Sequence, residues 1–158
     1  MKYFALLLSS LVLFPAVASA GESTRTHFPA TGRVPPGVNL APGAGVPFSA
    51  AVLAGDTLYI SGATDADPAT GQPATSPEAG AKIVLDALKA KVEKAGMTMD
   101  DVVWVQVFCT DLSYFPRFNA VYQGYFKGPL PARAFLGVDH LLGGAHFEVM
   151  GIAVRQPK

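Results

Sequence analysis

The hydrophobic pattern at residues 102–108 organises the rest of the chain, because these residues are β-branched and aromatic apart from one glutamine. This composition predicts a β-strand. Alternate residues of a strand point to opposite faces, and here both faces are apolar, so the strand is expected in the middle of a sheet. One face is expected to hold Val103, Val105, Val107 and Cys109, and the other Val102, Trp104 and Phe108.

An amphipathic helix is predicted after this strand. Thr110 and Asp111 end the strand, and either side chain can cap the helix that follows. Apolar residues then recur at steps of three and four, as on one face of a helix. They are Phe115, Phe118, Val121, Tyr122, Tyr125 and Phe126. A glycine and two prolines at 128–131 end the helix, and Arg133 stands at the start of the next apolar run.

The remaining apolar runs predict four more strands and one more helix. A tight turn at residues 54–56 joins the first two strands as a hairpin. The additional helix is expected to begin at Ser76, a capping residue followed by proline, and to end at Gly96. The strands are expected at residues 48–53, 57–61, 134–138 and 146–154.

The order hairpin, helix, strand, helix, strand, strand predicts an α+β domain, a single mixed β-sheet with both helices on one face. A sheet covered on one side leaves its other face apolar and bare. Half of the residues are hydrophobic and 15% are charged. One small domain does not need that much apolar surface, so a partner is expected to cover the bare face.

Three segments are predicted along the chain. Residues 1–20 have the pattern of a secretory signal peptide, with Lys2, a short apolar stretch and the cleavage site Ala18-Ser19-Ala20. Cleavage would give an exported protein, periplasmic or secreted, and an uncleaved anchor helix is the alternative. Residues 21–45 are rich in Pro, Gly, Ser and Thr and predict an extended or loosely held arm, whereas residues 46–158 predict the folded domain.

Charge and composition argue against several kinds of partner. The chain has 12 basic and 12 acidic residues, and removing residues 1–20 takes one lysine, so that 11 − 12 = −1. No basic cluster favours nucleic acid, and no apolar stretch after the signal peptide is long enough to cross a membrane.

The sequence predicts neither a metal site nor a cofactor site. His140 and His146 lack the spacing of a ligand pair. Asp65 and Asp67 lie in a polar, proline-containing loop, which we interpret as a solvated turn rather than a metal or phosphate loop. Cys109 is the single cysteine, so an intramolecular disulfide is impossible, and its strand position predicts a core residue rather than a reactive thiol.

Three residues could carry chemistry. Arg133 suits a carboxylate because its planar guanidinium donates two parallel hydrogen bonds, although it could equally pair with a neighbouring acid of the fold. Glu148 lies in a strand that is almost uncharged, where an inward position would raise its pKa and an outward position would make it an ordinary surface residue. Asn119 lies mid-helix, where asparagine is unfavourable unless a site or a local hydrogen bond retains it.

These segments resemble the RidA family of imine and enamine deaminases, also called YjgF. The likeness covers about residues 46–155 and is carried, in order, by VPFSAAVLAGDTLYISG, TDLSYFPRFNAVYQGYF, PAR and FEVMGIAVR. It implies a chorismate mutase-like fold and a homotrimer with sites between subunits. It also implies hydrolysis of small 2-imino or enamine acids, substrates that bear a carboxylate, to 2-oxo acids and ammonia.

The resemblance assigns roles to individual residues. Arg133 would hold the substrate carboxylate, helped by backbone N–H groups at Gly62 and Phe135. Glu148 would position the attacking water, and Asn119 matches a family asparagine whose role is as much structural as catalytic.

The chain also departs from the family pattern. Phe48 replaces a frequent tyrosine, which removes a hydroxyl from the implied pocket, Phe135 replaces a frequent cysteine, and Ala63 replaces a frequent glutamine. Some relatives are labelled endoribonucleases, a label that the near-neutral charge of this chain does not support. Two hypotheses therefore remain: an imine hydrolase, or a non-catalytic carboxylate-binding or holdase protein. Ammonia release from an imine generated in situ distinguishes them.

Overall fold

The computed structural model describes residues 24–30 and 45–156. The predicted signal peptide and most of the predicted arm lie outside these ranges. The described residues form six strands, two α-helices and four short 3-10 turns. The strands and helices are β1 Arg25–Pro29, β2 Ser49–Ala54, β3 Thr57–Thr64, α1 Pro77–Lys94, β4 Val102–Cys109, α2 Phe115–Tyr122, β5 Ala132–Gly137 and β6 Phe147–Val154.

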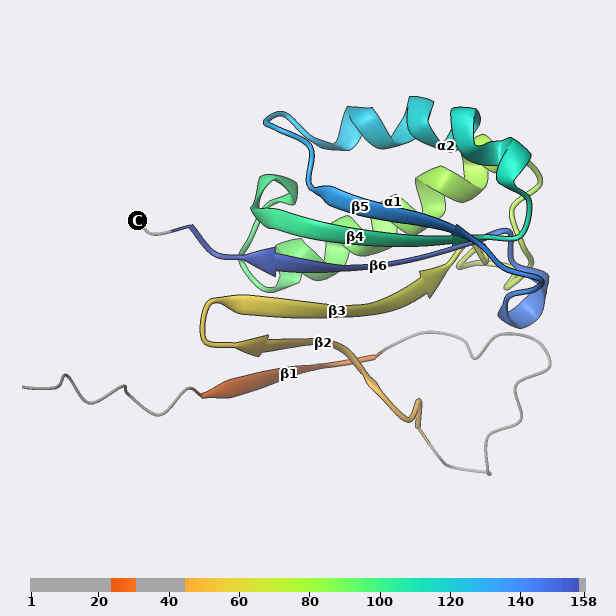
Figure 1. Cartoon of the computed structure of the whole chain (residues 1–158). Coiled ribbons are helices and arrows are strands. Elements are labelled where there is room, and N and C mark those ends of the chain that lie inside the picture. The colour runs from red at the N-terminus through yellow and green to blue at the C-terminus, as the bar shows by residue number, and fades with distance from the viewer. Residues whose placement is uncertain (1–23, 31–44, 157–158) are drawn as a thin grey trace, which may run out of the picture.

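The strands form one mixed sheet in the order β1-β2-β3-β6-β4-β5. Neighbouring strands are antiparallel except β4 and β5, which are parallel. A parallel pair needs a crossover connection, and α2 lies in that connection. Helix α1 packs on β3 and β6 and α2 packs on α1, so both helices lie on one face (Figure 1). The predicted α+β fold is confirmed.

The core lies between α1 and the middle of the sheet. Val84, Leu85 and Leu88 of α1 are fully buried, as are Val105 and Val149 on the facing strands. The ends of α1 are as the sequence predicts: Ser76 Oγ accepts a hydrogen bond of 3.2 Å from Ala79 N, and Gly96 takes a φ of 71° after the last turn. Cys109 is buried in this core, and its Sγ donates to the Asp111 carbonyl at 3.0 Å.

The predicted alternation of β4 is wrong at its first two residues. Val102 is buried, whereas Val103, expected on the face of Val105, is 43% exposed. The cause is a register shift against β6 between Val102 and Trp104, which inserts one extra residue. Such a bulge reverses the faces of the residues before it, so Val102 joins the core.

Part of the predicted arm is a strand. Residues 25–29 form β1, which pairs with β2 at one edge of the sheet, and His27 Nδ1 lies 3.1 Å from Ser49 Oγ. The segment has no apolar period, so the backbone ladder rather than side-chain burial defines it. Among the described residues, no helix has both the length and the hydropathy of a membrane span.

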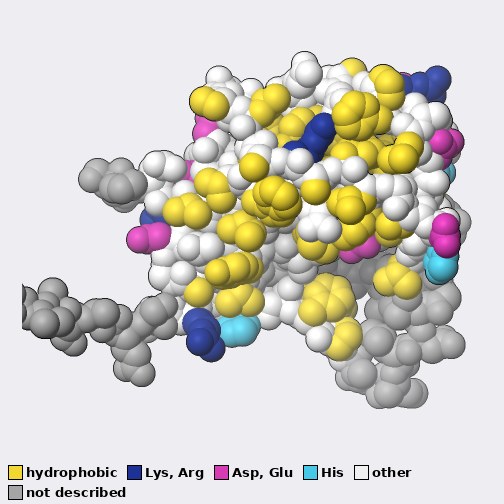
Figure 2. Space-filling view, viewed as in Figure 1, with side chains coloured by type: hydrophobic (Ala, Val, Ile, Leu, Met, Phe, Trp, Pro, Cys, Tyr) yellow, Lys and Arg dark blue, Asp and Glu magenta, His cyan; other side chains and the backbone are white. Residues whose placement is uncertain are grey.

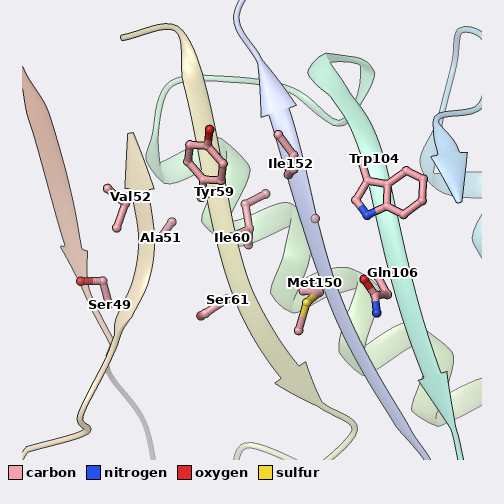
Figure 3. Close-up of a pocket in the computed structure, with 11 residues that line it drawn as sticks. Ser49, Ala51, Val52, Tyr59, Ile60, Ser61, Trp104, Gln106, Met150 and Ile152 are labelled. Carbon is pink, nitrogen blue, oxygen red and sulfur yellow. The ribbon is translucent and has the colours of Figure 1, made fainter. Parts of the chain in front are cut away.

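The sheet face that points away from the helices is apolar and hollowed. Hydrophobic side chains spread across it in Figure 2. A depression of about 470 Å³ lies over β2, β3, β6 and β4 (Figure 3). Tyr59, Trp104, Met150 and Ile152 are among its lining residues. We call this surface the open face.

Candidate active site

Arg133 lies beneath α2, surrounded by aromatic rings. It pairs with Val105 in the parallel register of β4 and β5, so it shares the helix-covered face with that buried valine. Its Cζ lies 4.4 Å from the ring centroid of Tyr122, 5.6 Å from Phe135, 5.7 Å from Phe115 and 6.0 Å from Phe118. The rings fix the guanidinium and exclude water from its faces, which strengthens its interaction with an anion.

Arg133 has donor capacity to spare. Its Nη2 donates to Asn119 Oδ1 at 2.7 Å, and it forms no salt bridge with a carboxylate of the described chain. Arg133 Nη1 and the Tyr122 hydroxyl are the two buried side-chain polar atoms in the described ranges that lack a hydrogen-bond partner. Orphaned buried donors are costly in a fold, and two of them at one place indicate a binding site.

A hollow of about 310 Å³ opens beside these two residues. Its lining residues are Asn119, Tyr122, Gln123, Leu130, Pro131 and Arg133. Burial raises the pKa of Tyr122 to about 12 despite the opposing charge of Arg133, so the hydroxyl stays protonated and can donate. A carboxylate fits this combination of a fixed guanidinium and a neutral donor. Sequence reasoning treated Tyr122 as core, although its position three residues after Asn119 places both on one side of α2.

Glu148 is half-buried on β6, on the open face. It pairs with Phe108, whose neighbours Val107 and Cys109 point to the helix-covered face. Its carboxyl lies against Gly62: a Cβ added to Gly62 would overlap Oε1 and lie 2.9 Å from Cδ. Burial raises the pKa of Glu148, and the positive charge of Lys91 opposes that rise. A raised pKa suits a general base near neutral pH.

Arg133 and Glu148 do not meet within one chain. Arg133 is level with Val105 on β4 and Glu148 with Phe108, three residues further along, and their side chains leave the sheet on opposite faces. The predicted site residues therefore divide into two groups. Arg133, Asn119 and Phe135 lie at β5 and α2, whereas Phe48, Gly62 and Glu148 lie at β2, β3 and β6.

The two phenylalanines that depart from the family pattern are placed differently. Phe135 packs edge-on against Phe115 at 5.0 Å and Phe118 at 5.4 Å between ring centroids, so it forms a wall beside Arg133. Phe48 precedes β2 and is 56% exposed.

Sequence reasoning missed Lys91, whose side chain reaches the sheet from α1. Its Nζ donates to the carbonyl of Ser61 at 2.8 Å and to that of Gly62 at 3.3 Å, and it lies 3.4 Å from Ser61 Oγ. Desolvation lowers the pKa of Lys91 to about 8, an effect that the charge of Glu148 opposes. The available signal was its spacing: Lys91 follows Leu88 by three residues and Val84 by seven, on the buried stripe of the helix.

The solvated turn predicted around Asp65 is wrong for that residue. Asp65 is fully buried and accepts hydrogen bonds from His146 N at 2.8 Å and Phe147 N at 3.3 Å, with His146 Nδ1 at 3.0 Å. Asp67 is partly exposed and accepts hydrogen bonds from the backbone of its own turn, at Ala69 and Thr70. The described residues bring no three His, Cys, Asp or Glu side chains together in a cluster that could hold a metal ion.

Comparisons with known proteins agree with this fold. Residues 38–155 match the family model described as endoribonuclease L-PSP. The chain is 40% identical over 119 residues to the 2-iminobutanoate/2-iminopropanoate deaminase of Mus musculus, covering 74% of this chain and 87% of that protein.

The chain is also similar to solved structures. RidA from an Antarctic Psychrobacter is 38% identical with a TM-score of 0.66, covering 73% of this chain and 94% of that one. TdcF from E. coli with bound serine is 30% identical with a TM-score of 0.70, covering 83% and 100%.

Proposed function

Because this chain belongs to the endoribonuclease L-PSP family, which includes the RidA proteins, we propose that it hydrolyses small 2-imino and enamine acids to 2-oxo acids and ammonia. Relatives named 2-iminobutanoate/2-iminopropanoate deaminase support this reaction. The observation that carries the proposal is Arg133, a guanidinium fixed by aromatic rings with one buried donor unused.

Substrate binding begins at the carboxylate. Arg133 Nη1 donates to one carboxylate oxygen, and the neutral hydroxyl of Tyr122, whose ring contacts the guanidinium, is a second donor for the carboxylate. The similar TdcF structure holds serine, which also carries a carboxylate. Fixing this end of the substrate places its C=N carbon, so that positioning lowers the barrier for an imine that already hydrolyses slowly unaided.

Glu148 serves as the general base. The water oxygen bonds to the C=N carbon while one water proton passes to Glu148 and from it to the imine nitrogen, which gives a carbinolamine. The C–N bond then breaks as the hydroxyl proton passes through Glu148 to the nitrogen, so that ammonia leaves and the hydroxyl oxygen becomes the C=O oxygen of the 2-oxo acid. The rate should increase as the pH rises through the raised pKa of Glu148, because the ionised carboxylate is the base.

The site is completed by a second copy of the chain. Arg133 and Glu148 leave opposite faces of one sheet, so a single chain cannot bring both to one small substrate. We propose a homotrimer in which the open faces pack together and each cleft takes Arg133 from one subunit and Glu148 from its neighbour. The apolar open face supports such an assembly.

A second candidate function follows from the same separation. The Arg133 hollow can bind a small carboxylate without Glu148, so a non-catalytic carboxylate-binding protein, or a holdase on the same trimeric scaffold, remains the alternative. Ammonia release from an imine generated in situ by an amino-acid oxidase decides between the two. A protein that binds 2-oxo acids but does not accelerate ammonia release supports the alternative.

The roles are tested with Arg133→Ala, Arg133→Lys and Glu148→Gln. Loss of the charged contact should cost roughly 2–4 kcal/mol in transition-state binding, tens- to hundreds-fold in kcat/KM. Lysine should recover little, because an ammonium lacks the planar fork that lets Arg133 bond to Asn119 through Nη2 and to the carboxylate through Nη1. Glu148→Gln keeps the size of the side chain and removes the base, so it should lose most activity while ligand binding persists.

Arg117→Ala and Glu93→Gln are the matched controls. Arg117 lies on α2 with Nε 3.6 Å from Glu78 Oε1, and Glu93 lies on α1; both are exposed. Both controls should keep full activity. If Arg133→Ala unfolds the protein or dissociates the oligomer with unchanged activity per chain, Arg133 is structural. Full hydrolysis by Glu148→Gln removes Glu148 from the mechanism.

A further inference from the structure

Lys91 occupies a position where α1 otherwise buries apolar side chains. The other lysines of the helix middle, Lys82 and Lys89, are exposed and pair with acids one turn later. Lys91 instead lies on the stripe of Val84 and Leu88, and its ammonium is largely removed from water. Burying a lysine costs free energy unless its charge is compensated. The groups at the sheet that bind the Lys91 ammonium therefore define what this residue does.

Those partners form the irregular part of β3. The register between β3 and β6 shifts between Ile60 and Ala63, which leaves Ser61 and Gly62 facing the single residue Met150. The bulge turns two carbonyl oxygens toward α1, and Lys91 Nζ donates to both of them. Bulges re-aim the backbone at functional sites, and this one adjoins the carboxyl of Glu148 through Gly62.

The charges of Lys91 and Glu148 also act on each other. Burial disfavours the charged form of both groups, and the charge of each group opposes that effect on the other. A positive charge behind the bulge favours the carboxylate form of Glu148. Lys91 can thus influence the proposed base without touching substrate.

We propose that Lys91 is a positioning residue of the site proposed above: its ammonium fixes the Ser61–Gly62 bulge of β3, and with it the backbone against which the Glu148 carboxyl lies. The inference rests on the proposed function for its catalytic consequence. The contacts between Lys91 and the bulge lie within a single chain, so they can be tested by a measurement that does not depend on catalysis.

The test compares Lys91→Met with Lys89→Met on the full-length protein. Methionine keeps most of the apolar stem of the lysine side chain, and it removes the charge together with the hydrogen bonds that the ammonium donates. Lys89 lies two residues earlier on the exposed side of α1, paired with Glu93, so it controls for loss of one lysine from this helix. The readouts are kcat/KM for imine hydrolysis against pH, and the pKa of Glu148 by NMR titration of protein labelled with ¹³C-glutamate, assigned with Glu148→Gln.

Lys91→Met should lower kcat/KM roughly 10- to 100-fold, because the bulge and Glu148 lose their fixed geometry. The pKa of Glu148 should rise, because burial is no longer opposed by the Lys91 charge, and the acid limb of the pH profile should move to higher pH with it. Lys89→Met should match the wild type in both readouts. If Lys91→Met behaves like Lys89→Met, the proposal is overturned.

Two further outcomes are also decisive. If the wild-type protein hydrolyses no imine, the proposed function fails, and the NMR titration alone judges Lys91: an unchanged pKa of Glu148 overturns its role and a raised one supports it. If Lys91→Met does not fold, Lys91→Gln, which retains donors but no charge, takes its place. Lys91→Gln should show the same rise in the pKa of Glu148. If the pKa of Glu148 does not rise in this variant, the proposal is overturned.

Discussion

Gly62 is a residue at which the lack of a side chain matters directly. The Glu148 carboxyl occupies the space that a Cβ would need. Gly62→Ala should therefore displace Glu148 toward the open face and lower kcat/KM by roughly 100-fold, with little loss of stability because the carboxylate end of Glu148 can move. Steady-state kinetics and thermal melting check both parts.

Gly124→Ala is the control for that substitution, because a Cβ at Gly124 meets no atom within 4 Å. It should leave activity unchanged. Equal activity of both alanine variants would show that the position of Glu148 against Gly62 is unimportant for the reaction.

At the scale of elements, Asp65 links the end of β3 to the start of β6. Its buried carboxylate accepts from two backbone N–H groups, at His146 and Phe147, and lies beside the His146 ring. Asp65→Asn places an amide among these donors and should reduce the free energy of unfolding by roughly 2–4 kcal/mol. Urea denaturation measures it.

The comparison for Asp65 is Asp67→Asn, two residues later in the same loop. Asp67 is partly exposed and caps a local turn, so its replacement should shift the urea midpoint far less than that of the fully buried Asp65. Equal shifts for the two variants would mean that the buried carboxylate does not stabilise the start of β6.

For the whole molecule, we expect a particle with the mass of three subunits in light scattering at micromolar concentration. Met150 lies in the hollow of the open face, and Met150→Lys should dissociate the particle because the new charge would be buried between subunits. The dissociated chain should keep its secondary structure and lose hydrolysis, since each cleft of the proposed trimer draws on two chains. A monomeric wild type, or a monomeric variant with full activity, contradicts the assembly.

The fold could be predicted from the sequence because its elements depend on local signals. Helix α1 is predicted by its apolar stripe and its Ser76 cap, and strand β4 is predicted by its apolar run. Arg133 and Glu148 could be selected as charged residues in apolar surroundings. Their placement on opposite faces of the sheet could not be predicted, because it follows from the order and register of the strands.

The surprises share one cause, since each depends on an irregular backbone or a distant partner. The bulge in β4 reverses Val102 and Val103, and the bulge in β3 gives Lys91 its acceptors. Asp65 is buried because β6, 81 residues later, brings His146 to it. The spacing of apolar residues along the chain contains no information about such pairings.

The separation of Arg133 from Glu148 has a genetic consequence in the proposed trimer. A chain defective in one of these residues still lends its intact half to a neighbour. Two inactive alleles, one lacking each residue, would therefore complement each other when co-expressed in mixed assemblies. By the same reasoning, a chain lacking both residues would be partly dominant, since it would spoil the clefts on both of its sides.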